Sequence, residues 1–244
     1  MSGRLLMNNI EPVPFKLPLY KRIFDIIISI LSILILWPLF IAVACLIKLE
    51  TKGAVFYKTK RVGAGYKSFV LYKFRSMKEG SDTLIHDLSH LNLYHYPKRE
   101  NTSTVFIKLR DDLRTTRIGR FIRNTHIDEL PQLYNVLKGD MSLVGNRPLE
   151  IYEAEQLKSR GEMLRFSAPA GITGLWQVQQ HRKLALIESE RISLDNFYAL
   201  KQSFLFDLSI LIKTIPVVLQ PKKIQLLPKD SQHTYTFSST SIKK

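Results

Sequence analysis

The adjacent carboxylates Asp128 and Glu129 are the strongest candidates for chemistry in this sequence. They follow a run of arginines spaced by three, which are Arg114, Arg117, Arg120 and Arg123. Because proline is tolerated only in the first turn of a helix, Pro131 predicts a helix that begins near Asp128. The free N–H groups and the dipole of a helix start favour anions. Carboxylates beside arginines therefore predict a site for a phosphate and Mg²⁺, with a simple helix cap at Asp128 as the alternative.

The composition indicates which partners such a site could have. The 244 residues include 36 Lys+Arg against 21 Asp+Glu, which gives a formal net charge of +15. A protein this basic is expected to bind nucleic acid, a phosphorylated small molecule or anionic lipid. The single cysteine excludes a disulfide framework and a cysteine-based zinc site. His86 and His90 have the spacing of two helical metal ligands, but no third ligand is evident, so surface histidines are the preferred interpretation.

An apolar stretch over residues 23–47 indicates association with a membrane, because it is longer than a core helix needs. Pro38 lies near its middle and removes a helical hydrogen bond, and neither half alone reaches across about 30 Å of hydrocarbon. Lysines and arginines flank both ends, whereas a spanning helix has one strongly basic flank. These features favour a re-entrant helix over a kinked span. A cleaved signal is the weakest alternative, because a signal core is shorter.

The rest of the chain predicts a small α/β fold. Strand-like runs at residues 54–57 and 68–74, joined by a glycine-rich turn at 63–65, predict a short β-hairpin. Residues 204–219 are strongly apolar and fit an interfacial amphipathic helix, with a core helix as the alternative. We therefore expect four segments: an N-terminal tail (1–19), a re-entrant membrane helix (20–49), a folded domain (50–220) and a disordered tail (221–244).

Six motifs occur in order along the chain. They are Lys21-Arg22-x-Phe-Asp25, the proline-broken apolar helix, Lys73-Phe-Arg-Ser-Met77, Ile127-Asp-Glu-Leu-Pro-Gln-Leu133, Lys138-Gly-Asp-Met-Ser-Leu-Val-Gly145 with Arg147-Pro148, and Gly171-Ile-Thr-Gly-Leu-Trp-Gln-Val178. This set resembles the bacterial sugar transferases that load a hexose-1-phosphate onto polyprenyl phosphate, the monotopic phosphoglycosyl transferases. The resemblance covers about residues 20–220. The last motif is most similar to the galactose- or glucose-phosphate transferases of capsule and exopolysaccharide pathways.

The resemblance implies a role for particular residues. It makes Asp128 the nucleophile that forms a covalent phosphosugar, and Glu129 the partner that helps to hold Mg²⁺ or tunes Asp128. It also implies a group of residues that bind the phosphates of the substrate: Arg147 with Pro148, Arg123, Lys73 and Arg75.

The implied reaction has a nucleotide-sugar, such as a UDP-hexose, and polyprenyl (undecaprenyl) phosphate as substrates, releases UMP, and has Mg²⁺ as its cofactor. The domain over residues 50–220 would then be catalytic and lie on the cytoplasmic face of the bacterial inner membrane. A homodimer is compatible with the resemblance. No nucleic-acid motif accompanies the basic charge, so nucleic acid is not expected as a partner. The alternative from the charge alone is a non-catalytic, membrane-anchored anion-binding protein.

Several positions depart from the family pattern or leave two interpretations open. Asn146 and Ala170 each stand where the family usually has proline, and the changed residues after Val178 put the sugar in doubt. Trp176 is either a stacking platform for a uracil or sugar ring, or a buried core residue. One further set shares a helical face and is either a structural network or a site: Arg191, Asp195 and Tyr198.

Overall fold

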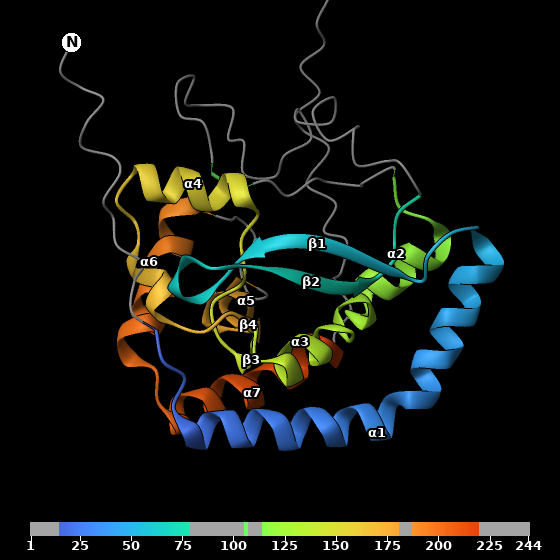
Figure 1. Cartoon of the computed structure of the whole chain (residues 1–244), viewed down its shortest axis with the longest axis horizontal. Coiled ribbons are helices and arrows are strands. Elements are labelled where there is room, and N and C mark those ends of the chain that lie inside the picture. Colours follow the sequence, from blue (N-terminus) through green and yellow to red (C-terminus); the bar gives the residue numbers. More distant parts are fainter. Residues whose placement is uncertain (1–14, 79–104, 107–113, 181–186, 220–244) are drawn as a thin grey trace, which may run out of the picture.

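The computed structural model describes residues 15–78, 105–106, 114–180 and 187–219. In these ranges the chain forms a mixed α/β fold, as expected, in which α1 (Leu19–Glu50) runs along two sides of the molecule and the remaining elements fill its angle (Figure 1). The expected disorder over 221–244 falls outside the described residues. So do most of the expected N-terminal tail and the histidine pair at residues 86 and 90.

Helix α1 is long, apolar and bent. It is the one described helix that is long and apolar enough to cross a membrane, and only 11% of its most apolar window is buried. Figure 1 shows a sharp change in its direction. Pro38 is the proline inside this helix, near its midpoint, and a proline removes the local hydrogen bond and crowds the preceding turn. The hydrogen-bonded helix nonetheless continues through the bend, so the expected helix-break-helix is one kinked helix.

A β-hairpin lies across the angle of α1 (Figure 1). Strand β1 (Phe56–Val62) pairs antiparallel with β2 (Ser68–Phe74), and Phe56 faces Phe74 in the register. The hairpin was expected, and β2 has its predicted bounds. Strand β1, however, begins two residues later than predicted and runs on through the lysine-rich stretch to Val62, because its outer face is exposed and accepts charged side chains.

The arginine-rich segment forms α2 (Arg117–Asn124). Of the four arginines spaced by three, Arg114 precedes this helix and the other three lie on it. Thr116 caps the helix by accepting a hydrogen bond from Gly119 N at 2.8 Å. A side chain at Gly119 would collide with Ser76 O, so this glycine lets α2 approach the chain that leaves β2.

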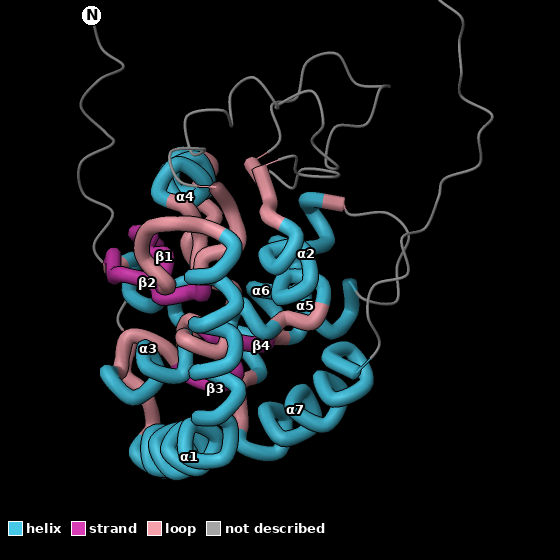
Figure 2. The backbone as a smooth tube through the Cα atoms, turned by 90° about the vertical axis from the view of Figure 1, so that its right-hand side faces the viewer, coloured by secondary structure: helices cyan, strands magenta, loops and turns pink. Residues whose placement is uncertain are grey.

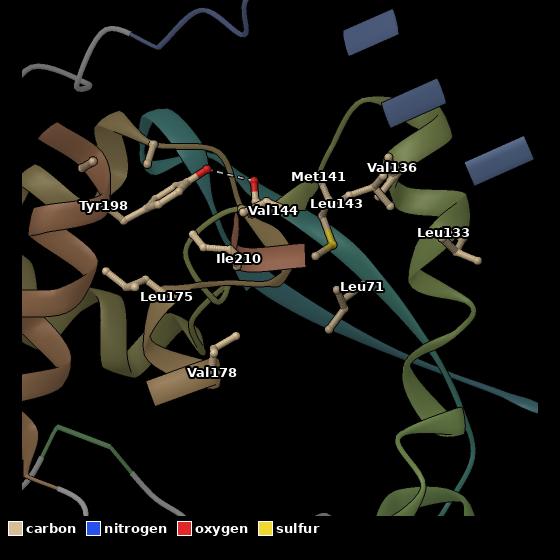
Figure 3. Close-up of a cluster of buried hydrophobic side chains, with 13 residues drawn as sticks. Leu71, Leu133, Val136, Met141, Leu143, Val144, Leu175, Val178, Tyr198 and Ile210 are labelled. Carbon is tan, nitrogen blue, oxygen red and sulfur yellow. Dashed lines mark hydrogen bonds between the residues drawn. The ribbon is translucent and has the colours of Figure 1, made fainter. Parts of the chain in front are cut away.

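Two shorter strands lie at the centre of the fold. Strand β3 (Ser142–Val144) pairs parallel with β4 (Gly171–Thr173), separately from the hairpin sheet. Three helices pack with them in the main core, α3 (Gln132–Lys138), α5 (Leu175–Gln180) and α6 (Glu188–Lys201), while α4 (Ile151–Ser159) packs against β1. The main core cluster includes Leu71, Leu143, Tyr198 and Ile210 (Figure 3).

Helix α7 (Phe204–Leu219) has the predicted bounds and lies beside the N-terminal half of α1 (Figures 1 and 2). The ring of Phe204 meets those of Tyr20 and Phe24 edge to face, with centroids 6.2 and 5.4 Å apart. A buried ion pair between Lys21 and Asp207 joins the same two helices. Ile210 of this helix belongs to the main core cluster, whereas most of its other apolar side chains are exposed. The interfacial placement of α7 stays a prediction.

Candidate active site

The two acidic residues lie in a single 3-10 turn, Ile127–Glu129, between α2 and α3. Helical structure thus begins near Asp128, as expected, but as a short 3-10 turn, and the α-helix α3 begins four residues later. His126 adopts a left-handed conformation (φ 59°, ψ 10°), which ends the helical path of α2 before the turn. Pro131 precedes α3 directly. Side chains on a 3-10 turn project about 120° apart, so Asp128 and Glu129 point in different directions.

Lys73 and Arg147 converge on this turn from two other parts of the chain. Lys73 Nζ donates a hydrogen bond to Glu129 Oε1 at 2.8 Å and lies 3.8 Å from Asp128 Oδ2. Arg147 Nη1 donates to the same Glu129 Oε1 at 3.2 Å. The structure thus brings four of the predicted site residues into one cluster. Their separation in sequence means that only the tertiary fold could unite them.

The cluster gives the two carboxylates different electrostatic surroundings. Burial raises the pKa of Asp128 above its usual range, and the charge of Lys73 only partly opposes this. Burial would raise the pKa of Glu129 as well, but the Lys73 ammonium and the Arg147 guanidinium together hold it well below its usual range. The carboxylate of Glu129 correspondingly raises the pKa of Arg147. Glu129 is therefore paired with two cations by direct bonds, whereas the charge of Asp128 is compensated only in part by cations at longer distance.

Asn135 on α3 fixes the strand that carries Lys73. Its Nδ2 donates to Val70 O at 2.6 Å, and its Oδ1 accepts from Tyr72 N at 3.0 Å. The amide side chain thus pairs with the open edge of β2 as a neighbouring strand would. Asn135 is fully buried, so these bonds are made without competition from water. Asn135 was not among the predicted site residues, and its signal in the sequence is a polar residue among the apolar residues Leu133 and Val136 of this helix.

Arg147 and the buried Pro148 follow β3, in a loop that two glycines allow to pack closely. A side chain at Gly145 would lie 2.2 Å from Pro169 O, and one at Gly171 would lie 2.1 Å from Gly145 N. Neither position has room for a Cβ atom. The glycines of the Leu-Val-Gly and Gly-Ile-Thr-Gly motifs therefore bring the end of β3 against β4, and this places Arg147 at the edge of the cluster.

The two remaining predicted arginines occupy different places. Arg123, in the last turn of α2, is close enough to Asp128 for its charge to lower the pKa of that carboxyl. Arg75 instead turns toward the end of α1. Its guanidinium donates to Lys52 O at 2.8 Å and to Thr51 O at 2.9 Å, so it anchors the chain that leaves the apolar helix. The structure does not bring Arg75 to the carboxylates, and its contact with a phosphate stays a prediction.

Trp176 is a buried residue of the second core cluster, in agreement with the simpler of its two interpretations. The guanidinium carbon of Arg191 lies 4.3 Å from its ring centroid and 3.6 Å from that of Phe106. The polar face of α6 proves to be a structural network. Asp195 binds Arg165, and the hydroxyl of Tyr198 donates to Asp207 Oδ1 at 2.8 Å.

The donor set is compatible with Mg²⁺. Within the described ranges no group of three or more His, Cys, Asp and Glu side chains converges as a metal cage. Mg²⁺ is commonly bound through one or two carboxylates together with waters and the phosphates of a substrate. Asp128 offers a buried carboxylate without direct neutralisation, and Glu129 has a second oxygen beyond the one that Lys73 and Arg147 share. The residues present therefore fit an ion that binds along with a diphosphate.

Buried carboxylates surrounded by lysine and arginine, carried by a fold with a long exposed apolar helix, are the arrangement expected of an enzyme that transfers phosphate groups at a membrane. The comparison with protein families agrees with this class. The chain matches the family described as "Bacterial sugar transferase" over residues 17–221, and it belongs to that family. The resemblance inferred from the six motifs is therefore confirmed, and the protein is a transferase rather than the non-catalytic anion-binding protein considered as the alternative.

The curated relatives carry more specific names. The chain is 38% identical over 198 residues to the exopolysaccharide production protein ExoY of Sinorhizobium fredii, a match that covers 81% of this chain and 84% of that protein. It is 40% identical over 200 residues to the undecaprenyl-phosphate galactose phosphotransferase of Salmonella typhimurium. It is 35% identical over 222 residues to the UDP-glucose:undecaprenyl-phosphate glucose-1-phosphate transferase of Klebsiella pneumoniae. These two matches cover 82% and 86% of this chain but only 40% and 43% of the relatives.

Proposed function

We propose that this protein transfers a sugar-1-phosphate from a UDP-hexose to undecaprenyl phosphate and releases UMP, as a first membrane step in the synthesis of a surface polysaccharide. The names of the relatives from Salmonella typhimurium and Klebsiella pneumoniae contain this class of acceptor, and the latter name contains a UDP-sugar donor. The observation that carries the proposal is the unequal pairing of the two carboxylates. Glu129 is bonded directly to two cations, whereas the buried Asp128 faces Lys73 at 3.8 Å, beyond hydrogen-bond distance.

Asp128 is the better nucleophile of the two. Glu129 accepts direct hydrogen bonds from Lys73 and Arg147, which lower the basicity of its oxygens. Asp128 Oδ2 faces the Lys73 ammonium at 3.8 Å, beyond hydrogen-bond distance. Its raised pKa means that burial destabilises the ionised carboxylate. A bond from its oxygen to phosphorus would remove that charge, so the ionised oxygen is the more reactive of the two.

The proposed reaction has two displacements at one phosphorus atom. An oxygen of Asp128 attacks the phosphorus that bears the sugar, the bond from that phosphorus to the bridging oxygen breaks, and UMP leaves with the electron pair. The product is an acyl phosphate between Asp128 and the sugar-1-phosphate. An oxygen of undecaprenyl phosphate then attacks the same phosphorus, the bond to Asp128 breaks, and the carboxylate is restored. Splitting the transfer in this way keeps the two anionic substrates from having to meet directly.

The cations of the cluster have distinct tasks in this scheme. Arg147 has a partly exposed side chain and can turn its free N–H groups to the phosphate oxygens while Glu129 holds one of them. Lys73 keeps Glu129 ionised, and its charge also favours the ionised form of Asp128 against the effect of burial. Mg²⁺, held by Asp128 and Glu129, would neutralise the diphosphate. Arg123 adds positive charge on the side of α2.

The bent α1 supports a re-entrant topology. Its apolar side chains are exposed on both sides of Pro38, while its two ends are fixed to the same folded domain. At one end Arg22 donates to Val136 O and to Leu137 O, the latter at 2.7 Å. At the other end Arg75 binds Thr51 and Lys52. A helix whose two ends reach one domain can dip into the bilayer and return, which would leave that domain on the cytoplasmic face.

The test follows UMP release and covalent labelling in the full-length protein in detergent micelles. The wild type, with undecaprenyl phosphate and Mg²⁺, is given a panel of UDP-sugars, and at least one should release UMP. Intact-mass measurement with that UDP-sugar and no lipid acceptor should then find a hexose-phosphate increment on the wild type and none on Asp128→Asn. Glu129→Gln serves as the matched control, because it neutralises the neighbouring carboxylate but leaves the nucleophile.

The outcomes separate the parts of the proposal. No UMP from any UDP-sugar would contradict the donor class. An adduct on Asp128→Asn, or UMP release that requires undecaprenyl phosphate to be bound first, would contradict the covalent role of Asp128 and favour direct attack by the lipid phosphate.

A further inference from the structure

A buried ion pair between Arg165 and Asp195 contacts the backbone of the loop that carries Arg147. Arg165 Nη2 donates to the backbone carbonyl of Arg147 at 2.9 Å. The same guanidinium binds Asp195 Oδ2 through Nη2 at 2.8 Å and through Nε at 3.2 Å. The side chains of Arg165 and Asp195 are only 2% and 3% exposed. The contact with Arg147 is therefore made by a charged group that the interior of the protein keeps in one orientation.

Asn146 ties the same loop to both members of the ion pair. Its Nδ2 donates to Arg165 O at 2.9 Å and to Asp195 O at 3.0 Å. Its backbone N–H donates to Pro169 O at 2.9 Å, and its carbonyl accepts from Gly171 N at the same distance. These four hydrogen bonds connect the side chain and the backbone of Asn146 to neighbouring segments. They fix the position of Asn146, and with it the start of the loop at Arg147. The proline usual in the family at this position could make neither the side-chain bonds nor the backbone donation.

The buried ion pair between Arg165 and Asp195 is not explained by stability alone. Burying an ion pair in place of apolar side chains generally brings little or no net stability, because both charges lose their water. Here the fork of the guanidinium is divided between a carboxylate on α6 and a carbonyl in the loop after β3. A fixed fork of this kind specifies geometry. The only predicted site residue that it contacts is Arg147.

We propose that Asn146, Arg165 and Asp195 are positioning residues that fix the backbone of Arg147 so that its guanidinium meets both Glu129 and the phosphate that is transferred. This inference rests on the proposed function. The side chain of Arg147 is held at its tip by a single bond to Glu129, which a bound diphosphate would compete for. With its backbone fixed, the guanidinium keeps its direction toward Glu129 while its free N–H groups meet the phosphate oxygens. A displacement of about 1 Å at such a group can lower turnover by about a hundredfold.

The experiment is a double-mutant cycle on UMP release by the full-length protein in micelles, with undecaprenyl phosphate, Mg²⁺ and the UDP-sugar that the wild type turns over fastest. Arg165→Met should lower kcat by about tenfold to a hundredfold. Arg147→Ala should lower it by about a hundredfold or more. If Arg165 acts through Arg147, adding Arg165→Met to Arg147→Ala should lower kcat by less than about threefold further.

Tyr198→Phe is the matched control. It lies on the same face of α6 as Asp195, is fully buried, and loses hydrogen bonds to Val144 O and Asp207, but makes no bond to Arg147. It should lower the melting temperature, and any effect that it has on kcat should be the same with and without Arg147. This behaviour is what a merely structural role of Arg165 would also produce.

Each outcome decides one point. A loss of kcat on Arg165→Met that persists in full in the Arg147→Ala background would overturn the positioning role while leaving the proposed function intact. Wild-type kcat in Arg165→Met would also overturn it. If the wild type releases no UMP from any UDP-sugar, the proposed function itself is wrong. If Arg147→Ala and Asp128→Asn both release UMP at the wild-type rate, the reaction stands but these residues do not carry it, and the positioning role falls with them.

Discussion

Replacing Lys73 with methionine tests whether the charge of this lysine stabilises the folded protein against the repulsion and desolvation of Asp128 and Glu129. The ammonium lies 2.8 Å from Glu129 Oε1 and 3.8 Å from Asp128 Oδ2. At an effective dielectric constant of about 20, these distances correspond to gross attractions of about 6 and about 4 kcal/mol. The desolvation of the ammonium offsets much of this, and removing one partner of a buried pair typically costs about 3–5 kcal/mol. We expect Lys73→Met to lower the free energy of unfolding by about 3 kcal/mol.

The measurement is thermal unfolding in micelles at neutral pH with the divalent ions chelated. A loss of about 3 kcal/mol corresponds to a fall in melting temperature of about 6–12 °C for a domain of this size. Because the ammonium is closer to Glu129 than to Asp128, most of this fall should disappear when Lys73→Met is made in a Glu129→Gln background. Lys60→Met, an exposed change on the outer face of β1, is the control and should alter stability by less than about 0.5 kcal/mol.

Two results would refute this reasoning. Equal melting temperatures for Lys73→Met and Lys60→Met would mean that the ion cluster contributes nothing to the fold. A fall of the same size with and without the carboxylate of Glu129 would mean that Lys73 stabilises the protein by packing of its aliphatic stem rather than by its charge.

Three further predictions concern the carboxylate, the apolar helix and the metal. Because burial raises the pKa of Asp128, its ionised form destabilises the folded state, so Asp128→Asn should raise the melting temperature at neutral pH in a chelating buffer. This gain should shrink once the pH falls below the raised pKa and vanish near the usual pKa of an aspartate; an unchanged or lower melting temperature at neutral pH would contradict it. Pro38→Ala should straighten α1 and move its two ends to opposite faces of the membrane in a fraction of molecules, measured by labelling tags at both termini; a wild type with its termini on opposite faces would exclude the re-entrant topology. Strong chelation of divalent ions should abolish UMP release and added Mg²⁺ should restore it, whereas release that survives chelation would remove Mg²⁺ from the mechanism.

Much of this protein could be predicted from local signals in its sequence. The apolar stretch and Pro38 predict a membrane-associated helix with a break near its middle, which the structure shows as one kinked helix, and the strand-like run over 68–74 predicts β2 with its observed bounds. The apolar run over 204–219 gives α7 in the same way. These features depend on neighbours within a few residues, so one pass along the chain can detect them. The ordered motifs also carried enough information to identify the family.

Other features were decided by packing between distant segments. The sequence suggested a helix start at Asp128, but a left-handed His126 and the docking of α3 leave that residue in a buried 3-10 turn. Lys73 and Arg75 are two residues apart and look equivalent in the sequence. The twist and docking of the hairpin turn the first toward Glu129 and the second toward the end of α1.

The ion pair between Arg165 and Asp195 shows most clearly which features depend on tertiary structure and not on local sequence. Spacing on α6 identified Asp195 as a member of a polar face, but nothing in the sequence assigns it a partner. The partner is Arg165, thirty residues earlier, and the two meet because β3, β4 and α6 pack around the close approach of Gly145 and Gly171. Local sequence determines which residues can form helices, strands and charged clusters. The tertiary structure decides which charge faces which, because a bond between buried groups depends on the position of every element packed around it.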